Sequence, residues 1–72
     1  MTAREMIKIL RSVGCEETRK GKGSHVLFRV GRCSTVVPVH KGEDLAPGTV
    51  RNIERHLAPC LGQGWLGQIL GK

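Results

Sequence analysis

The sequence predicts an α+β domain in which one helix is followed by three antiparallel strands and a second helix. Two patterns lead to this prediction. Hydrophobic residues recur with a helical period in 3–13 and 47–57, whereas they alternate with the two-residue period of strands in 26–39. The 72 residues are enough for a single core, and a core of this size contributes only about 3–5 kcal/mol of stability. Such a domain often depends on a partner, a metal ion or a disulfide.

The first helix is predicted over residues 3–13. Thr2 and Glu5 match a capping box. In this motif the Thr hydroxyl accepts a hydrogen bond from the Glu amide, and the Glu carboxylate accepts one from the Thr amide. One apolar stripe follows at helical spacing, formed by Met6, Ile9, Leu10 and Val13. Gly14 is placed to end the helix in a left-handed conformation.

Residues 15–19 are predicted to form a short, polar edge strand that leads into a loop of Lys and Gly. Two more strands lie on either side of Gly31-Arg32, where glycine in first position suits a type II′ turn. This turn pairs Val30 with Cys33 and His25 with Pro38. One face of the sheet then carries Val26, Phe28, Val30, Thr35, Val37 and Val39.

The other face of this hairpin is predicted to carry His25, Leu27 and Arg29. Pro38 lacks an amide hydrogen for the ladder, so its strand is expected either to lie at an edge of the sheet or to have the amide position of Pro38 facing away from a neighbouring strand.

The second helix is predicted to begin near Pro47, because proline suits the first turn of a helix. Its apolar stripe is Val50, Ile53 and Leu57, and Pro59 is expected to end it. The following residues, 58–72, carry one charge, four glycines and several large apolar side chains. We therefore divide the chain into a domain, 1–57, and a Gly-rich apolar tail, 58–72. The tail either packs on the domain, forms a surface for a partner or a homodimer, or is poorly ordered.

The net charge of +6 favours an anionic partner such as nucleic acid, an acidic protein or a membrane surface. No signal peptide and no apolar run of membrane-spanning length is present, so we expect a cytoplasmic protein that does not enter a membrane. Cys15, Cys33 and Cys60 are odd in number and widely spaced, which argues against a disulfide framework and fits a reducing compartment. The cysteines and histidines lack the spacing of zinc ligands, so neither a metal nor a cofactor is expected.

His25 stands in a basic segment that contains no Asp or Glu. Between Thr18 and Gly42 the charged residues are Arg19, Lys20, Lys22, Arg29, Arg32 and Lys41. Such a segment attracts phosphate and places a titratable imidazole beside it. The pairing suggests RNA chemistry, although an exposed histidine at a strand end has the same local pattern.

Four stretches of the sequence resemble the HicA, or YcfA-like, family of toxins, which are mRNA interferases. These are the end of the first helix at residues 10–15, Gly23-Ser24-His25, Val37-Pro38-Val39-His40 and residues 45–53, within a resemblance that extends from residue 3 to about 57. The order helix, three strands, helix is that of a small double-stranded-RNA-binding-like fold. The resemblance implies a metal-independent endoribonuclease with His25 as its catalytic residue, mRNA as its substrate and a HicB-type antitoxin as its partner.

RNA can be cleaved without a metal because its own 2′-OH attacks the adjacent phosphorus, and we expect His25 to act as the general base. Gly23 would let the backbone approach a phosphate, which the hydroxyl and amide of Ser24 could contact. The positively charged groups expected to position the strand are Lys20, Lys22, Arg29 and Lys41.

The other two histidines have open roles. His40 would stand one diagonal step from His25 if the strand pairing extends past Pro38, where it could protonate the leaving oxygen; otherwise it ends a strand. His56, late in the second helix, is expected to be structural or solvated.

Two other functions remain open from the residues. One is a non-catalytic RNA-binding module of the same fold, and the other is an adaptor whose basic face meets only an acidic protein. The first would bind RNA without depending on His25, and the second would show no salt-dependent RNA binding.

Overall fold

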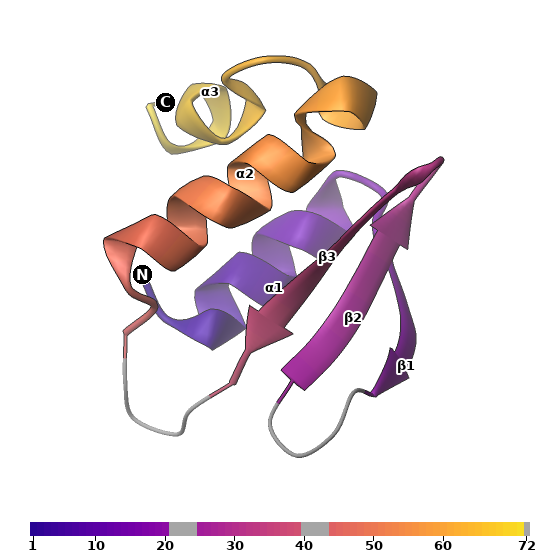
Figure 1. The fold of residues 1–72 in the computed structure, drawn as a ribbon. Coiled ribbons are helices and arrows are strands. Elements are labelled where there is room, and N and C mark those ends of the chain that lie inside the picture. Colours follow the sequence, from indigo (N-terminus) through magenta and orange to yellow (C-terminus); the bar gives the residue numbers. More distant parts are fainter. Residues whose placement is uncertain (21–24, 40–43, 72) are drawn as a thin grey trace.

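The computed structural model describes residues 1–20, 25–39 and 44–71. Helix α1 precedes a three-stranded antiparallel sheet of strand order β1-β2-β3, and helices α2 and α3 complete the chain (Figure 1). The elements are α1 (Ala3–Ser12), β1 (Glu16–Lys20), β2 (His25–Val30), β3 (Cys33–Pro38), α2 (Pro47–Leu61) and α3 (Trp65–Leu70). The predicted α+β class is confirmed. None of the described helices is long and apolar enough to cross a bilayer.

Helix α1 begins at the predicted capping box. The Glu5 amide donates to Thr2 Oγ1 at 3.1 Å, and the Thr2 amide donates to Glu5 Oε1 at 2.8 Å. The hydrogen bond from the Thr2 amide stabilises the carboxylate and lowers the pKa of Glu5 from its ordinary value of 4.5. At the other end Gly14 has a φ of 94°, which the missing Cβ permits, and the Cys15 amide donates to the Leu10 carbonyl.

The β2–β3 hairpin has the register that the turn residues predict. Val30 pairs with Cys33, Phe28 with Thr35 and His25 with Pro38. Gly31 has a φ of 57°, and no residue other than glycine in the described ranges has a positive φ, as a type II′ turn at Gly31-Arg32 requires. Strand β3, which ends at Pro38, is an edge strand as expected.

Strand β1 is the opposite edge of the sheet and begins one residue later than predicted. Glu16 pairs with Arg29 and Glu17 with Phe28, but Lys20 pairs with Val26, so the register shifts by one residue along the strand. This bulge-like irregularity lies at an edge, where such features are common. An ion pair of 3.2 Å between Arg11 and Glu17 also links α1 to this strand.

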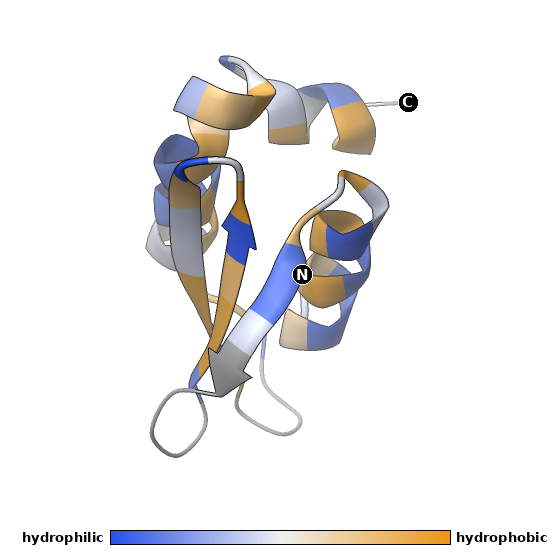
Figure 2. Ribbon diagram, turned by 90° about the vertical axis from the view of Figure 1, so that its right-hand side faces the viewer, coloured by the Kyte–Doolittle hydropathy of each residue, from blue (hydrophilic) through white to orange (hydrophobic). Residues whose placement is uncertain are grey.

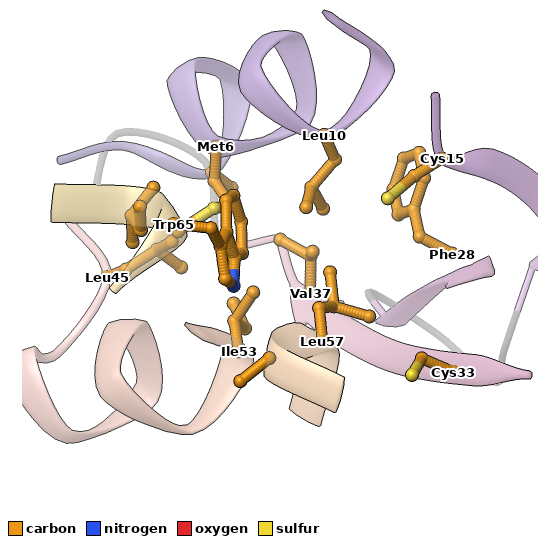
Figure 3. Close-up of a cluster of buried hydrophobic side chains, with 13 residues drawn as sticks. Met6, Leu10, Cys15, Phe28, Cys33, Val37, Leu45, Ile53, Leu57 and Trp65 are labelled. Atoms are coloured by element: carbon orange, nitrogen blue, oxygen red, sulfur yellow. The ribbon is translucent and has the colours of Figure 1, made fainter. Parts of the chain in front are cut away.

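Both long helices cover the same face of the sheet. Figure 2 looks onto the strands with the helices behind them, and hydrophobic residues occupy the middle of β2 and the later part of β3. Fully buried side chains from α1, the sheet and α2 meet between these layers: Met6, Leu10, Phe28, Val37, Ile53 and Leu57 (Figure 3). None of the described helices lies over the opposite face of the sheet.

Pro59 does not end the second helix, contrary to the sequence-based expectation. Helix α2 continues through Pro59 to Leu61, and the Gly62 amide donates to the Ala58 carbonyl at 2.7 Å. A proline in the last turn removes a single hydrogen bond, and continued packing outweighs that loss. The helix therefore crosses the proposed domain boundary between residues 57 and 58.

The tail packs onto the domain, the first of the three alternatives considered for it. Trp65 and Leu66 of α3 are 4% and 2% exposed, and Figure 3 draws Trp65 between Met6 of α1 and Ile53 of α2. The indole Nε1 donates to the Glu54 carbonyl at 2.9 Å, so its one polar atom is satisfied. The apolar content of the tail thus belongs to the same core as the rest of the chain.

Cys33 and Cys60 form a disulfide with a Cα–Cα distance of 6.2 Å. This corrects the expectation, drawn from the number and spacing of the cysteines, that argued against structural disulfides. The spacing of the cysteines along the chain gave no indication of this disulfide. The two cysteines lie 27 residues apart and meet only where the end of α2 reaches the start of β3. Cys15 is a buried free thiol, and its burial raises its pKa.

Thr35 is the one polar residue among those that the structure describes as buried, at 3% exposure. Its Oγ1 lies 3.1 Å from His56 Nδ1 of α2, so the hydroxyl is hydrogen-bonded in the core. A hydroxyl can donate to a neutral ring nitrogen or accept from a protonated one, so either state of the imidazole keeps this contact. His56 therefore has a structural contact, in line with the role favoured from sequence.

Replacing His56 with alanine is expected to lower the free energy of unfolding by about 1–3 kcal/mol, because the buried Thr35 hydroxyl loses its partner. Thr35→Val should have a smaller effect, since the exposed imidazole can then bond to water. Urea denaturation of both variants under non-reducing conditions measures the difference. An equal loss in the two variants would contradict this account of the pair.

Candidate nucleic-acid interface

His25 is the first residue of β2 and is exposed on the face of the sheet that carries no helix. The local sequence dictates this orientation. Phe28 is fully buried among the core residues, and because strand side chains alternate, His25, Leu27 and Arg29 project from the opposite face. The predicted catalytic residue thus stands on an accessible surface at one end of the middle strand.

We call the helix-free side of the sheet the open face; its described residues on β2 and β3 are His25, Leu27, Arg29, Ser34, Val36 and Pro38. Leu27 pairs with Val36, which is 39% exposed, and His25 pairs with Pro38. A small apolar strip therefore crosses the sheet between His25 at one end and Arg29 towards the other. Such a surface can contact both apolar and anionic groups.

Glu16 lies opposite Arg29 in the sheet, a pairing that was not expected from the sequence. It is the Cα partner of Arg29 on β1, and it is exposed. Opposite charges at paired positions attract each other, so Glu16 offsets part of the charge that Arg29 would offer to a phosphate. The basic segment contains no acid, but the sheet brings one in from outside it, and only the β1–β2 register could have revealed this.

Several predicted site residues lie outside the described residues: Lys22, Gly23, Ser24, His40 and Lys41. Lys20 is described by its backbone as the last residue of β1, where it pairs with Val26. Lys20, His25 and Pro38 therefore lie at the same end of the sheet. The structure thus places the backbone of Lys20, a predicted RNA-binding residue, near His25. Arg29, also predicted to bind RNA, lies further along β2.

A hollow of about 320 Å³ lies elsewhere, between α2 and the start of α3. It is lined by Arg51, Glu54, Arg55, Ala58, Gln63 and Gly64, none of which was predicted as a site residue. Within the described ranges no three His, Cys, Asp or Glu side chains are grouped so as to hold a metal ion.

Taken together, these features define a class of protein: a small basic α+β domain of double-stranded-RNA-binding-like fold, with a histidine exposed on the face opposite its helices. The family is given by comparison with known proteins. Residues 3–70 match the family described as the HicA toxin of bacterial toxin–antitoxin systems, so the chain belongs to the HicA toxin family. It is the toxin of a toxin–antitoxin system and has a cognate antitoxin as its partner.

The match includes nearly all of the apolar tail, which extends the resemblance noted up to residue 57. No significant match was found among curated proteins or among solved structures.

Proposed function

We propose that this toxin is a metal-independent endoribonuclease that cleaves mRNA with His25 as its general base. The observation that carries the proposal is the exposure of His25 on the open face of the sheet, in a chain of the HicA toxin family. A base must reach the 2′-OH of a bulky polymer, and His25 is exposed on a sheet face that none of the described helices covers.

In this mechanism the neutral imidazole of His25 accepts the 2′-OH proton as the oxygen attacks phosphorus. The P–O5′ bond breaks, leaving a 2′,3′-cyclic phosphate on one product and a 5′-OH on the other. Developing charge on the phosphoryl oxygens would be offset by positively charged groups and backbone amides. The residues proposed for this are Gly23, Ser24, Lys20, Lys22, Lys41 and Arg29.

His40 remains the proposed proton donor to the leaving oxygen, as the second histidine of the same basic segment. Arg29 is proposed as a weaker phosphate contact than the lysines, because Glu16 lies opposite it on β1.

The cognate antitoxin is proposed to be of the HicB type and to inhibit the toxin by covering His25. A matching surface would present apolar groups to Leu27 and Val36 and acidic groups to the basic residues around them. Action on mRNA would place both proteins in the cytoplasm. A homodimer through the tail would have to use Ile69 and Leu70, which are 37% and 53% exposed, since Trp65 and Leu66 are buried in their own domain.

The test is incubation of the purified toxin with a labelled single-stranded RNA in excess EDTA, followed by identification of the product termini. We expect cleavage that EDTA does not inhibit and that leaves 2′,3′-cyclic phosphate or 3′-phosphate ends. Addition of the cognate antitoxin should suppress it. Products with 3′-OH ends, or cleavage lost in EDTA, would exclude the proposed chemistry.

RNA binding without cleavage would instead favour the non-catalytic RNA-binding module. A salt titration tests the adaptor function. The RNA affinity of a chain that contacts phosphates falls as the salt concentration rises, whereas an adaptor that binds only an acidic protein shows no salt-dependent RNA binding.

A further inference from the structure

Cys33 and Cys60 occupy two elements that hold them in place independently of the disulfide. Cys33 starts β3 and pairs with Val30 across the Gly31-Arg32 turn, and Cys60 lies in the last turn of α2. Their Cα–Cα distance of 6.2 Å is within the usual range for a disulfide, about 4.4–6.8 Å. Because hydrogen-bonded backbone positions both residues, two reduced thiols would stay within reach of each other and could pair again.

The two sulfur-bearing residues differ in access to solvent. Cys33 is 9% exposed in the core, whereas Cys60 is exposed on the helix surface. A Cβ at position 31 would stand 3.5 Å from Cys60 Sγ, so the glycine turn lies beside the disulfide and places no side chain against this sulfur. Cys60 is therefore the more accessible of the two residues to a small thiol.

We propose that Cys33 and Cys60 form a reversible thiol–disulfide exchange site, in which Cys60 reacts with low-molecular-weight thiols and their disulfides and Cys33 is the resolving cysteine. The chemistry is independent of the ribonuclease activity proposed above.

Oxidation begins when the Cys60 thiolate attacks a small disulfide, forming a mixed disulfide on Cys60 and releasing one small thiolate. The Cys33 thiolate then attacks Cys60 Sγ, and the second small thiolate leaves. Two protein thiols and one small disulfide thus become one protein disulfide and two small thiols, a two-electron exchange without another oxidant. Reduction is the reverse, starting with attack of a small thiolate on Cys60 Sγ and departure of the Cys33 thiolate.

The bond controls how firmly α2 is attached to the sheet. A disulfide links Cys60 to Cys33, and one helical turn earlier a hydrogen bond links His56 to Thr35. These two links fix the position of α2 along β3. Reduction removes the covalent link and opens a loop that spans 27 residues of sequence. His25 lies at the other end of the hairpin, opposite Pro38, so its surroundings should not change.

The reacting sulfur is identified with oxidised glutathione and two folded variants. Cys33→Ala lacks the resolving thiol and should retain one glutathione, mapped to Cys60 by peptide mass spectrometry. Cys60→Ser should acquire none in the native state, because Cys33 and Cys15 are buried. No adduct on Cys33→Ala, or an adduct on native Cys60→Ser, would overturn the proposal.

The consequence for the fold is measured by thermal unfolding with and without dithiothreitol. The wild-type melting temperature should fall by an amount on the order of 15 °C on reduction, and that of Cys60→Ser should not respond. An unchanged wild type, or an equal response in Cys60→Ser, would refute the proposed effect on stability. Neither experiment uses RNA, so a failure of the ribonuclease assay leaves both results intact.

Discussion

Replacing His25 with alanine is expected to lower the rate of RNA cleavage by about 10²–10⁴-fold, the usual contribution of a general base, while RNA affinity stays nearly the same. The affinity should persist because binding depends on the charge of several lysines and arginines rather than on one imidazole. Stability should persist as well, since His25 is exposed at a strand start and is not part of the buried core. The rate is measured with labelled single-stranded RNA in EDTA, and the affinity by binding to a 2′-deoxy analogue that cannot be cleaved.

Ser34→Ala is the matched control for this experiment. Ser34 is exposed on the same open face but pairs with Arg29, four residues along β2 from His25. The control should cleave at the wild-type rate. If His25→Ala also cleaved at that rate, another group would have to be the base, and His40 would be the next residue to replace. If Ser34→Ala lost activity with His25→Ala, the effect would belong to the open face in general rather than to the imidazole.

Replacing Trp65 with alanine is expected to lower the free energy of unfolding by about 3–5 kcal/mol. The indole is 4% exposed between the two long helices, and its Nε1 donates to the Glu54 carbonyl, so the change leaves a cavity and removes a hydrogen bond. The loss is comparable to what the core of so small a domain supplies. The loss of stability is measured by urea denaturation under non-reducing conditions, so that the disulfide stays formed. Unfolding is followed by far-UV circular dichroism, because the variant has no tryptophan fluorescence.

Leu70→Ala is the control within the same helix. Leu70 is 53% exposed, so its replacement should change stability by no more than about 0.5 kcal/mol. Equal midpoints for Trp65→Ala and Leu70→Ala would show that α3 does not complete the core. The comparison thus tests the packing of the tail separately from its apolar composition.

The hairpin shows why part of this fold could be predicted residue by residue. A glycine in the first turn position sets the pairing, and a shift by one residue would turn Phe28 from the core to solvent. The capping box at Thr2 and the left-handed Gly14 are equally local, since each depends on neighbours within a few residues. For these elements the physical cause lies entirely within a short stretch of sequence.

The features that were missed all depend on contacts between distant segments. Pro59 weakens a helix locally, but packing maintains α2 as far as Leu61. Likewise Glu16 reaches Arg29 only through the register of an edge strand, which no turn residue specifies.

The sequence by itself therefore determined the order of the elements from α1 to α2, the register of β2 and β3, and the orientation of His25, because backbone sterics and side-chain alternation act over a few residues. Only the tertiary structure decided that Cys33 meets Cys60, that Thr35 bonds to His56 and that Trp65 fills the space between α1 and α2. Each of those contacts joins residues far apart in the chain, and their distance is set by the packing of whole helices against the sheet.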